Sequence, residues 1–96
     1  MKMSQGEKQY CLFIDQMERL NPTTNLVVEK HNFHADHVCI SSVGNKRIIT
    51  LIVQERTLVI NYLDAKCNIR NKPVYNVAEV AVMATNFLTG KSGELK

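Results

Sequence analysis

The sequence predicts an α+β fold with the element order α-β-β-β-β-α, in which a four-stranded antiparallel meander carries the N- and C-terminal helices on one face. Two observations predict this fold. Amphipathic helical patterns with polar cap residues stand near both ends of the chain, over residues 4–20 and 76–88. Between them, residues 26–63 contain four short runs rich in Val, Ile and Leu, separated by turn residues.

The first helix begins with a capping box. Ser4 can accept a hydrogen bond from the third helical amide, while the side chain of Glu7 reaches back to the amide of Ser4. Pro22 ends the helix, because proline disfavours helical geometry in the residue before it. The apolar residues of this helix form one stripe at i, i+3, i+4 and i+7 spacing: Tyr10, Phe13, Ile14, Met17 and Leu20.

Four strands are expected after this helix. Gly44 and Asn45 mark a clear turn, and Glu55 with Arg56 marks the next reversal. Short connections of this kind join neighbouring antiparallel strands, which favours a meander. The expected strands cover residues 26–31, 37–43, 47–54 and 57–63.

The segment after the fourth strand has no apolar periodicity. We expect residues 64–72 to form an irregular loop that Pro73 closes. Asn76 then caps the last helix, and Gly90 stands where a left-handed C-terminal cap is expected. Residues 91–96 are expected to be a loose tail.

Composition favours a single cytoplasmic domain over residues 1–96, with residues 1–3 and 91–96 as loose termini. The three cysteines are widely spaced, odd in number and without a CxxC pair, which is typical of thiols in a reducing compartment. No secretory leader pattern and no long apolar run are present, so we expect no membrane segment. The net charge of +3 is too small to predict a nucleic-acid partner.

The central strands predict self-association. The run at residues 47–54 is apolar on both parities, which indicates a central strand covered on both faces. If both helices share one face, the other face must be covered in some other way. It would expose an apolar patch around Thr50 and Asn61 that favours a homodimer, made by Val27, Ile48, Ile52 and Val59.

Potential metal ligands are densest around the first expected hairpin. Histidine and cysteine side chains, which can bind zinc, fall within the nine residues 31–39. They match no recognised ligand spacing, so a polar hairpin tip is the simpler interpretation. Metal binding stays as the second alternative function, with these candidate ligands: His31, His34, His37 and Cys39.

Basic residues gather at one end of the expected sheet. In a meander, alternate turns fall at the same end, so the turn at residues 44–46 and the loop at 64–72 should be neighbours. The start of the last helix near Asn76 is expected to add its positive dipole there. The candidate residues for binding an anion or a partner at this basic end are Lys46, Arg47, Lys66, Arg70 and Lys72.

No motif names a reaction. The sequence lacks a Gly-rich phosphate loop, an HExxH pattern and a pair of carboxylates placed for acid and base chemistry, so we expect no enzyme and no cofactor. The favoured interpretation is a small non-catalytic interaction module, an adaptor, inhibitor or regulatory protein that binds another protein as a homodimer. The alternative is a nucleic-acid-binding protein that uses the basic end.

Overall fold

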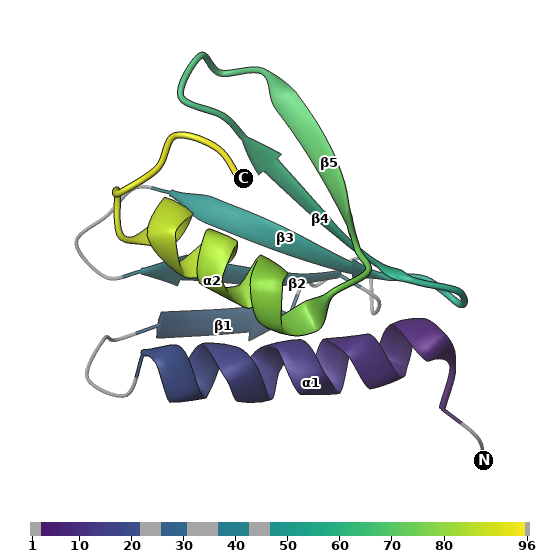
Figure 1. The fold of residues 1–96 in the computed structure, drawn as a ribbon. Helices are drawn as coiled ribbons and strands as arrows, with labels where there is room; N and C mark the ends of the chain where they lie inside the picture. Colours follow the sequence, from purple (N-terminus) through teal and green to yellow (C-terminus); the bar gives the residue numbers. More distant parts are fainter. Residues whose placement is uncertain (1–2, 22–25, 31–36, 43–46, 96) are drawn as a thin grey trace.

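The structure, a computed structural model, describes residues 3–21, 26–30, 37–42 and 47–95 (Figure 1). The strands form one antiparallel sheet in the order β1-β2-β3-β4-β5, so each strand pairs with the next one in the chain. The α+β class and the meander with a helix at each end are therefore confirmed. No helix in the described part of the chain is long and apolar enough to cross a membrane. The elements are α1 Gln5–Leu20, β1 Leu26–Lys30, β2 His37–Ser42, β3 Ile48–Val53, β4 Leu58–Leu63, β5 Ile69–Val74 and α2 Val77–Leu88.

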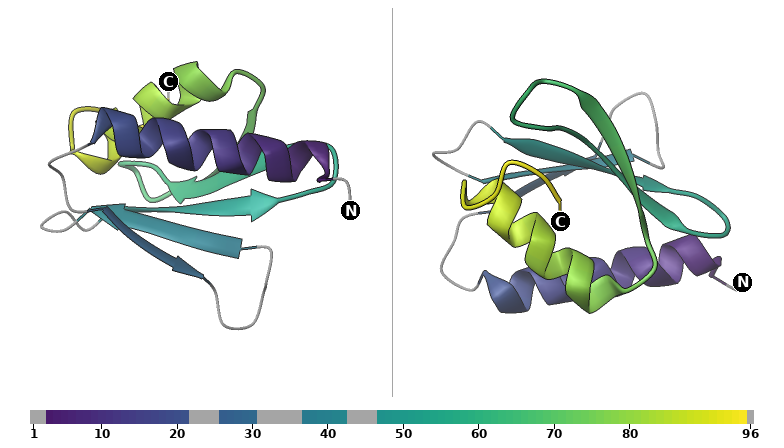
Figure 2. Two further views of the ribbon diagram at one scale, coloured as in Figure 1. Left: turned by 90° about the horizontal axis from the view of Figure 1, so that it is seen from below. Right: turned by 45° about the horizontal axis from the view of Figure 1, so that its top comes forward.

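Both helices lie on the same face of the sheet and also pack against each other (Figure 2). Phe13 and Met17 of α1 and Phe87 of α2 are fully buried between the helices and the strands. Successive strand residues point to opposite faces, so one parity of each strand enters this core. The buried strand residues are Val38, Ile40, Ile49, Leu51, Leu58, Ile60, Tyr62 and Val74.

Helix α1 begins and ends as its sequence predicts. Ser4 Oγ accepts from the amide of Glu7 at 3.2 Å, and Glu7 Oε1 accepts from the amide of Ser4 at 3.3 Å. At the other end, the buried side chain of Asn21 donates to the carbonyl of Met17 at 2.9 Å and to Thr85 Oγ1 at 3.0 Å. The second bond ties the end of α1 to α2.

The expected irregular loop over residues 64–72 contains a fifth strand instead. β5 pairs with β4 in antiparallel fashion. Val74 lies opposite Leu58 at one end of the ladder, and Ile69 lies opposite Leu63 at the other. The sequence pattern does not reveal this strand, because two of its three positions facing the helix side carry Arg70 and Lys72 in place of apolar residues. β5 is an edge strand, and such a strand tolerates proline because one of its sides needs no ladder hydrogen bonds.

The extra strand reverses the direction in which the chain enters α2. Val74 pairs with Leu58, so α2 starts at the end of β4 opposite to the β4–β5 turn. The expectation that the start of the last helix lies at the basic end is therefore wrong. The C-terminus of α2 lies there, because Arg47 at the start of β3 donates to the carbonyl of Phe87.

Capping residues bound α2 at both ends. The side chain of Asn76 accepts from the amide of Glu79 at 3.1 Å, which satisfies one amide of the first turn. Gly90 has a φ of 82°, the left-handed conformation expected for the residue after the helix. The chain then turns back toward the sheet.

The segment after α2, expected to be loose, packs against the β4–β5 hairpin. Leu95 is only 2% exposed and joins the core. Its amide donates to Tyr62 Oη at 3.3 Å, and the amide of Ala65 donates to the carbonyl of Gly93 at 3.1 Å. One apolar side chain and these backbone bonds are enough to order a tail that composition alone assigns to solvent.

A buried glutamine connects α1 to the start of the β4–β5 ladder. Gln9 Nε2 donates to the carbonyl of Val74 at 2.7 Å, and Gln9 Oε1 accepts from the amide of Leu58 at 2.7 Å. Gln9 reaches these groups because α1 lies very close to the β3–β4 turn at Gly6. A Cβ at Gly6 would lie 1.7 Å from the carbonyl oxygen of Gln54 in that turn. Gly6 and Gln9 together set the position of α1 on the sheet.

We expect Gln9→Ala to lower the free energy of unfolding by about 2–4 kcal/mol, because it leaves a buried amide and a buried carbonyl without their partner. Urea unfolding followed by circular dichroism measures the change. Gln5→Ala, at an exposed position of the same helix, is the control and should change stability by less than about 0.5 kcal/mol. Equal effects of the two substitutions would contradict the role assigned to Gln9.

Candidate functional site

The start of β3 and the turn after β4 lie side by side, whereas the turn at residues 44–46 lies outside the described residues. A recess of about 280 Å³ is lined by Arg47 and Ile48 from the start of β3 and by Leu63, Asp64 and Ala65 from the end of β4. Of the predicted basic residues, Lys46 lies outside the described residues. The other four fall at this end of the sheet or on the helix side of β5.

The part-buried side chain of Arg47 binds groups of its own fold. Its Nη1 donates to the carbonyl of Phe87 at 3.0 Å and also to the carbonyl of Ser92, and its guanidinium lies 4.9 Å from the centroid of the Phe87 ring. A cation is favourable here because the C-terminus of α2 carries a partial negative charge. That ring contacts the Tyr62 ring edge-on at 5.1 Å. Arg47 therefore fastens the end of α2 to the sheet.

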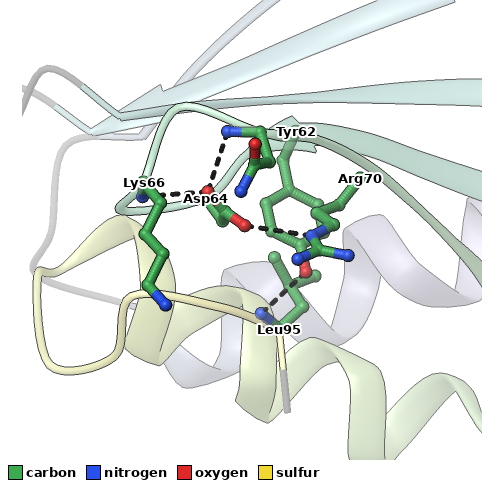
Figure 3. Close-up of polar contacts among 6 residues, drawn as sticks. Tyr62, Asp64, Lys66, Arg70 and Leu95 are labelled. Carbon is green, nitrogen blue, oxygen red and sulfur yellow. Dashed lines mark hydrogen bonds and ion pairs between the residues drawn. The ribbon is translucent and has the colours of Figure 1, made fainter.

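Asp64 organises the β4–β5 turn (Figure 3). Its carboxylate is 1% exposed, and Oδ1 accepts from the amides of Lys66 and Asn68, both at 2.9 Å. Oδ2 accepts from Arg70 Nε at 3.0 Å. The amide of Asn68, the side chain of Arg70 and the amide of Lys66 stabilise the charged form and hold the pKa of Asp64 below its ordinary value, although burial opposes the shift.

Arg70 and Lys72 line a recess of about 350 Å³ together with Tyr62, Asn71, Glu94 and Leu95. The Arg70 side chain is half exposed, so part of its guanidinium reaches this recess although Asp64 holds its Nε. Glu94 brings a carboxylate to the same recess. Lys66 is exposed in the turn, next to Cys67, which adopts a φ of 64°. This end is thus basic but partly neutralised.

The predicted histidine cluster is described only in part. His31 and His34 lie outside the described residues. His37 and Cys39 share the face of β2 that points away from the helices, and Cys39 Sγ lies 3.7 Å from Thr50 Oγ1. Among the residues that the structure describes, no group of three His, Cys, Asp or Glu side chains could hold a metal ion.

The sheet has a second face that no described helix or strand covers (Figure 2). Ile48, Leu63 and Ile69 are 53%, 55% and 72% exposed on it. At the outward positions of β2 to β5 there is no Lys, Arg, Asp or Glu. We call this surface the open face; its residues are His37, Cys39, Ser41, Ile48, Thr50, Ile52, Val59, Asn61, Leu63, Ile69, Asn71 and Pro73.

Cross-strand register arranges the open face in three rows. The central row is polar and carries a 2.9 Å hydrogen bond from Asn61 Nδ2 to Asn71 Oδ1. One flanking row contains Ser41 and three apolar residues, and the other flanking row contains His37 and three apolar residues. The central row is Cys39, Thr50, Asn61 and Asn71, and the flanking rows are Ser41, Ile48, Leu63 and Ile69, and His37, Ile52, Val59 and Pro73.

The apolar patch expected from the sequence agrees with this face at Ile48, Ile52 and Val59. Val27 pairs with Ser41 in the β1–β2 ladder, and its side chain lies outside what the structure describes. Sequence reasoning missed Ile69 and Pro73, because it assigned their segment to a loop; β5 extends the face by one strand.

Comparison with protein-family models, with curated proteins and with solved structures finds no match for this chain. Function must therefore be argued from the surfaces of the molecule.

We expect Arg47→Ala to lower the free energy of unfolding by about 1.5–3 kcal/mol, because two carbonyls lose a charged donor. It should also speed amide hydrogen exchange at Ala65 and Leu95, whose bonds hold the tail that Arg47 fastens. Arg56→Ala, in the exposed β3–β4 turn, is the control. Unchanged exchange at Ala65 and Leu95 in the Arg47 variant would show that the tail is held without it.

Asp64 should make the protein sensitive to acid. Its pKa is lowered in the fold, so its contribution to stability is complete above the ordinary carboxyl pKa of about 4 and is lost as the pH falls below it. We expect Asp64→Asn to flatten this part of the curve of melting temperature against pH. Glu18→Gln on the exposed side of α1 should keep the curve of the unmodified protein. Parallel curves for Asp64→Asn and the unmodified protein would contradict the assignment.

Proposed function

We propose that the protein is a small non-catalytic interaction module, an adaptor, inhibitor or regulatory protein that binds another protein chain, and that the open face is its binding surface. The observation that carries the proposal is the combination of exposed apolar rows and missing charge on this face. Monomeric proteins rarely leave a contiguous apolar patch of more than a few hundred Å² in water.

The distribution of charge supports the same surface. Arg47, Arg70 and Lys72 stand at positions that alternate with those of the open face, so they belong to the helix side of the sheet. The core of a protein interface is depleted in charged residues, whereas its rim is polar. The open face has this character, with the exposed Lys66 in the turn at one edge.

The two recesses at the basic end fit a binding module better than an enzyme. Both recesses are open to the surface and are lined in part by residues of turns and of the edge strand β5, whereas small-molecule sites are usually deep and mostly apolar. The proposal places the protein in the cytoplasm, because Cys11, Cys39 and Cys67 are unpaired thiols.

Nucleic-acid binding at the basic end is the second candidate. One observation favours it, namely that Arg70 and Lys72 line the same recess. Glu94 in that recess and the pairing of Arg70 with Asp64 reduce its net charge. If this candidate holds, affinity for mixed oligonucleotides falls steeply as salt is raised, and Lys66→Glu with Lys72→Glu abolishes it.

The proposal predicts that another polypeptide lies on the open face in the cell. Ile52 is replaced by p-benzoylphenylalanine, and the protein is irradiated in cells of its source organism. We expect a protein adduct of defined mass, because the flanking row at position 52 lies within the contact. The readout is immunoblotting followed by mass spectrometry.

The matched control carries the same photoreactive residue in place of Glu18, which is exposed on α1. It should give no adduct of that mass. If position 52 gives no adduct, or if both positions give the same set, the open face is not the binding surface and the proposal is wrong.

A further inference from the structure

We infer that the occupant of the open face is a second copy of this chain, stacked sheet on sheet about a twofold axis. This inference rests on the proposed function, since it names the partner for the same surface. Three properties of the face carry it: its neutrality, the symmetry of its rows and its size.

The absence of charged residues from β2 to β5 of the open face favours self-association in particular. In an isologous dimer each patch meets the same patch, so a charge on it comes close to its own copy. Like charges brought together in a desolvated contact are costly. The outward positions of β2 to β5 carry no Lys, Arg, Asp or Glu, although charged residues make up 22% of the chain; the charged position of the same parity, Glu29, lies on the edge strand β1, where it pairs with Cys39. An acidic or nucleic-acid partner, by contrast, would require basic residues on the face.

The rows make the face complementary to itself. A twofold axis that relates two stacked sheets lies between them and parallel to both. An axis along the strands, or an axis across them that lies over the central row, places the central row of one copy over the central row of the other. Polar residues of the central row, such as Thr50 and Asn61, then lie over polar residues of the same row of the partner, where hydroxyl and amide groups can each donate and accept. The apolar rows meet apolar rows on both sides.

The polar row also sets the register of the two copies. A shift by one row would bury Asn61 against apolar side chains without a hydrogen-bond partner, and a buried unsatisfied amide is unfavourable. Aligned sheets pack with their strands within about 30° of each other, which keeps the rows close to superposition. The contact is therefore specific as well as apolar.

The face is large enough for a dimer. The open face and the adjoining edge strand β1 together make five strands, which are spaced about 4.8 Å apart, are five or six residues long at about 3.4 Å per residue, and span roughly 24 by 20 Å. Two such faces bury about 1,000 Å², the lower bound for a biological interface. The dimer also covers the second face of β3, the strand that is apolar on both parities.

Sedimentation velocity of the purified full chain over a range of concentrations tests the inference. We expect a dimer. Leu63→Lys removes a side chain that is 55% exposed on the open face, and Leu12→Lys removes one that is 56% exposed on α1, so the two variants differ in place and not in exposure or charge. The first should raise the dissociation constant at least about tenfold, and the second should leave it unchanged.

Thr50→Lys is a second variant, in the middle of the central row, where it brings two ammonium groups together near the axis. It should yield a monomer whose circular dichroism spectrum matches that of the unmodified protein. Leu63→Lys keeps the test decisive if Thr50→Lys does not fold. A monomeric unmodified protein, or a dimer that Leu12→Lys disrupts and Leu63→Lys does not, overturns the inference.

The two proposals can fail separately. A photo-adduct at position 52 with twice the mass of the chain supports both. An adduct with a different protein, together with a monomeric purified chain, retains the proposed function and overturns the second copy as occupant. Absence of both adduct and dimer overturns both.

Discussion

Burial of one parity of every central strand beneath two helices is the constraint on which the rest of the structure depends. Phe13, Met17 and Phe87 fill the space above the strands, and Gln9 fixes the height and direction of α1 by bonding both β4 and β5. Because both helices occupy one face, the other face has no cover of its own among the described elements. The apolar residues that β3 and β4 present there are the structural basis of the proposed function.

At the basic end, the topology places two predicted binding residues, Arg47 and Arg70, where they form hydrogen bonds within the fold. Arg47 neutralises the carbonyl end of α2, and Arg70 neutralises a buried carboxylate in the β4–β5 turn. Both arginines therefore support the fold locally, one through the helix terminus and one through the turn. The charge that remains for a partner belongs chiefly to Lys66 and Lys72, and Glu94 offsets part of it.

Separation of charged and neutral surfaces gives the molecule two sides with different chemistry. On β2 to β5 the charged residues stand at positions of the helix side or in turns, whereas the open face carries imidazole, thiol, hydroxyl, amide and aliphatic groups. Stacking of two neutral faces leaves the helices and the basic end of each copy accessible. A dimer would thus present two copies of every remaining surface to a further partner, related by the same axis.

The sequence by itself determined the helices, their caps, the first four strands and the apolar character of both faces of β3, because these depend on periodicity and on local hydrogen bonds. The residues Ile48, Ile52 and Val59 of the open face follow from the same periodicity. Only the tertiary structure decided that residues 69–74 form a strand, since their pairing comes from backbone contact with β4 and leaves no apolar pattern. That strand reversed α2 and brought its C-terminus to Arg47, which no local signal could indicate because the two are 40 residues apart.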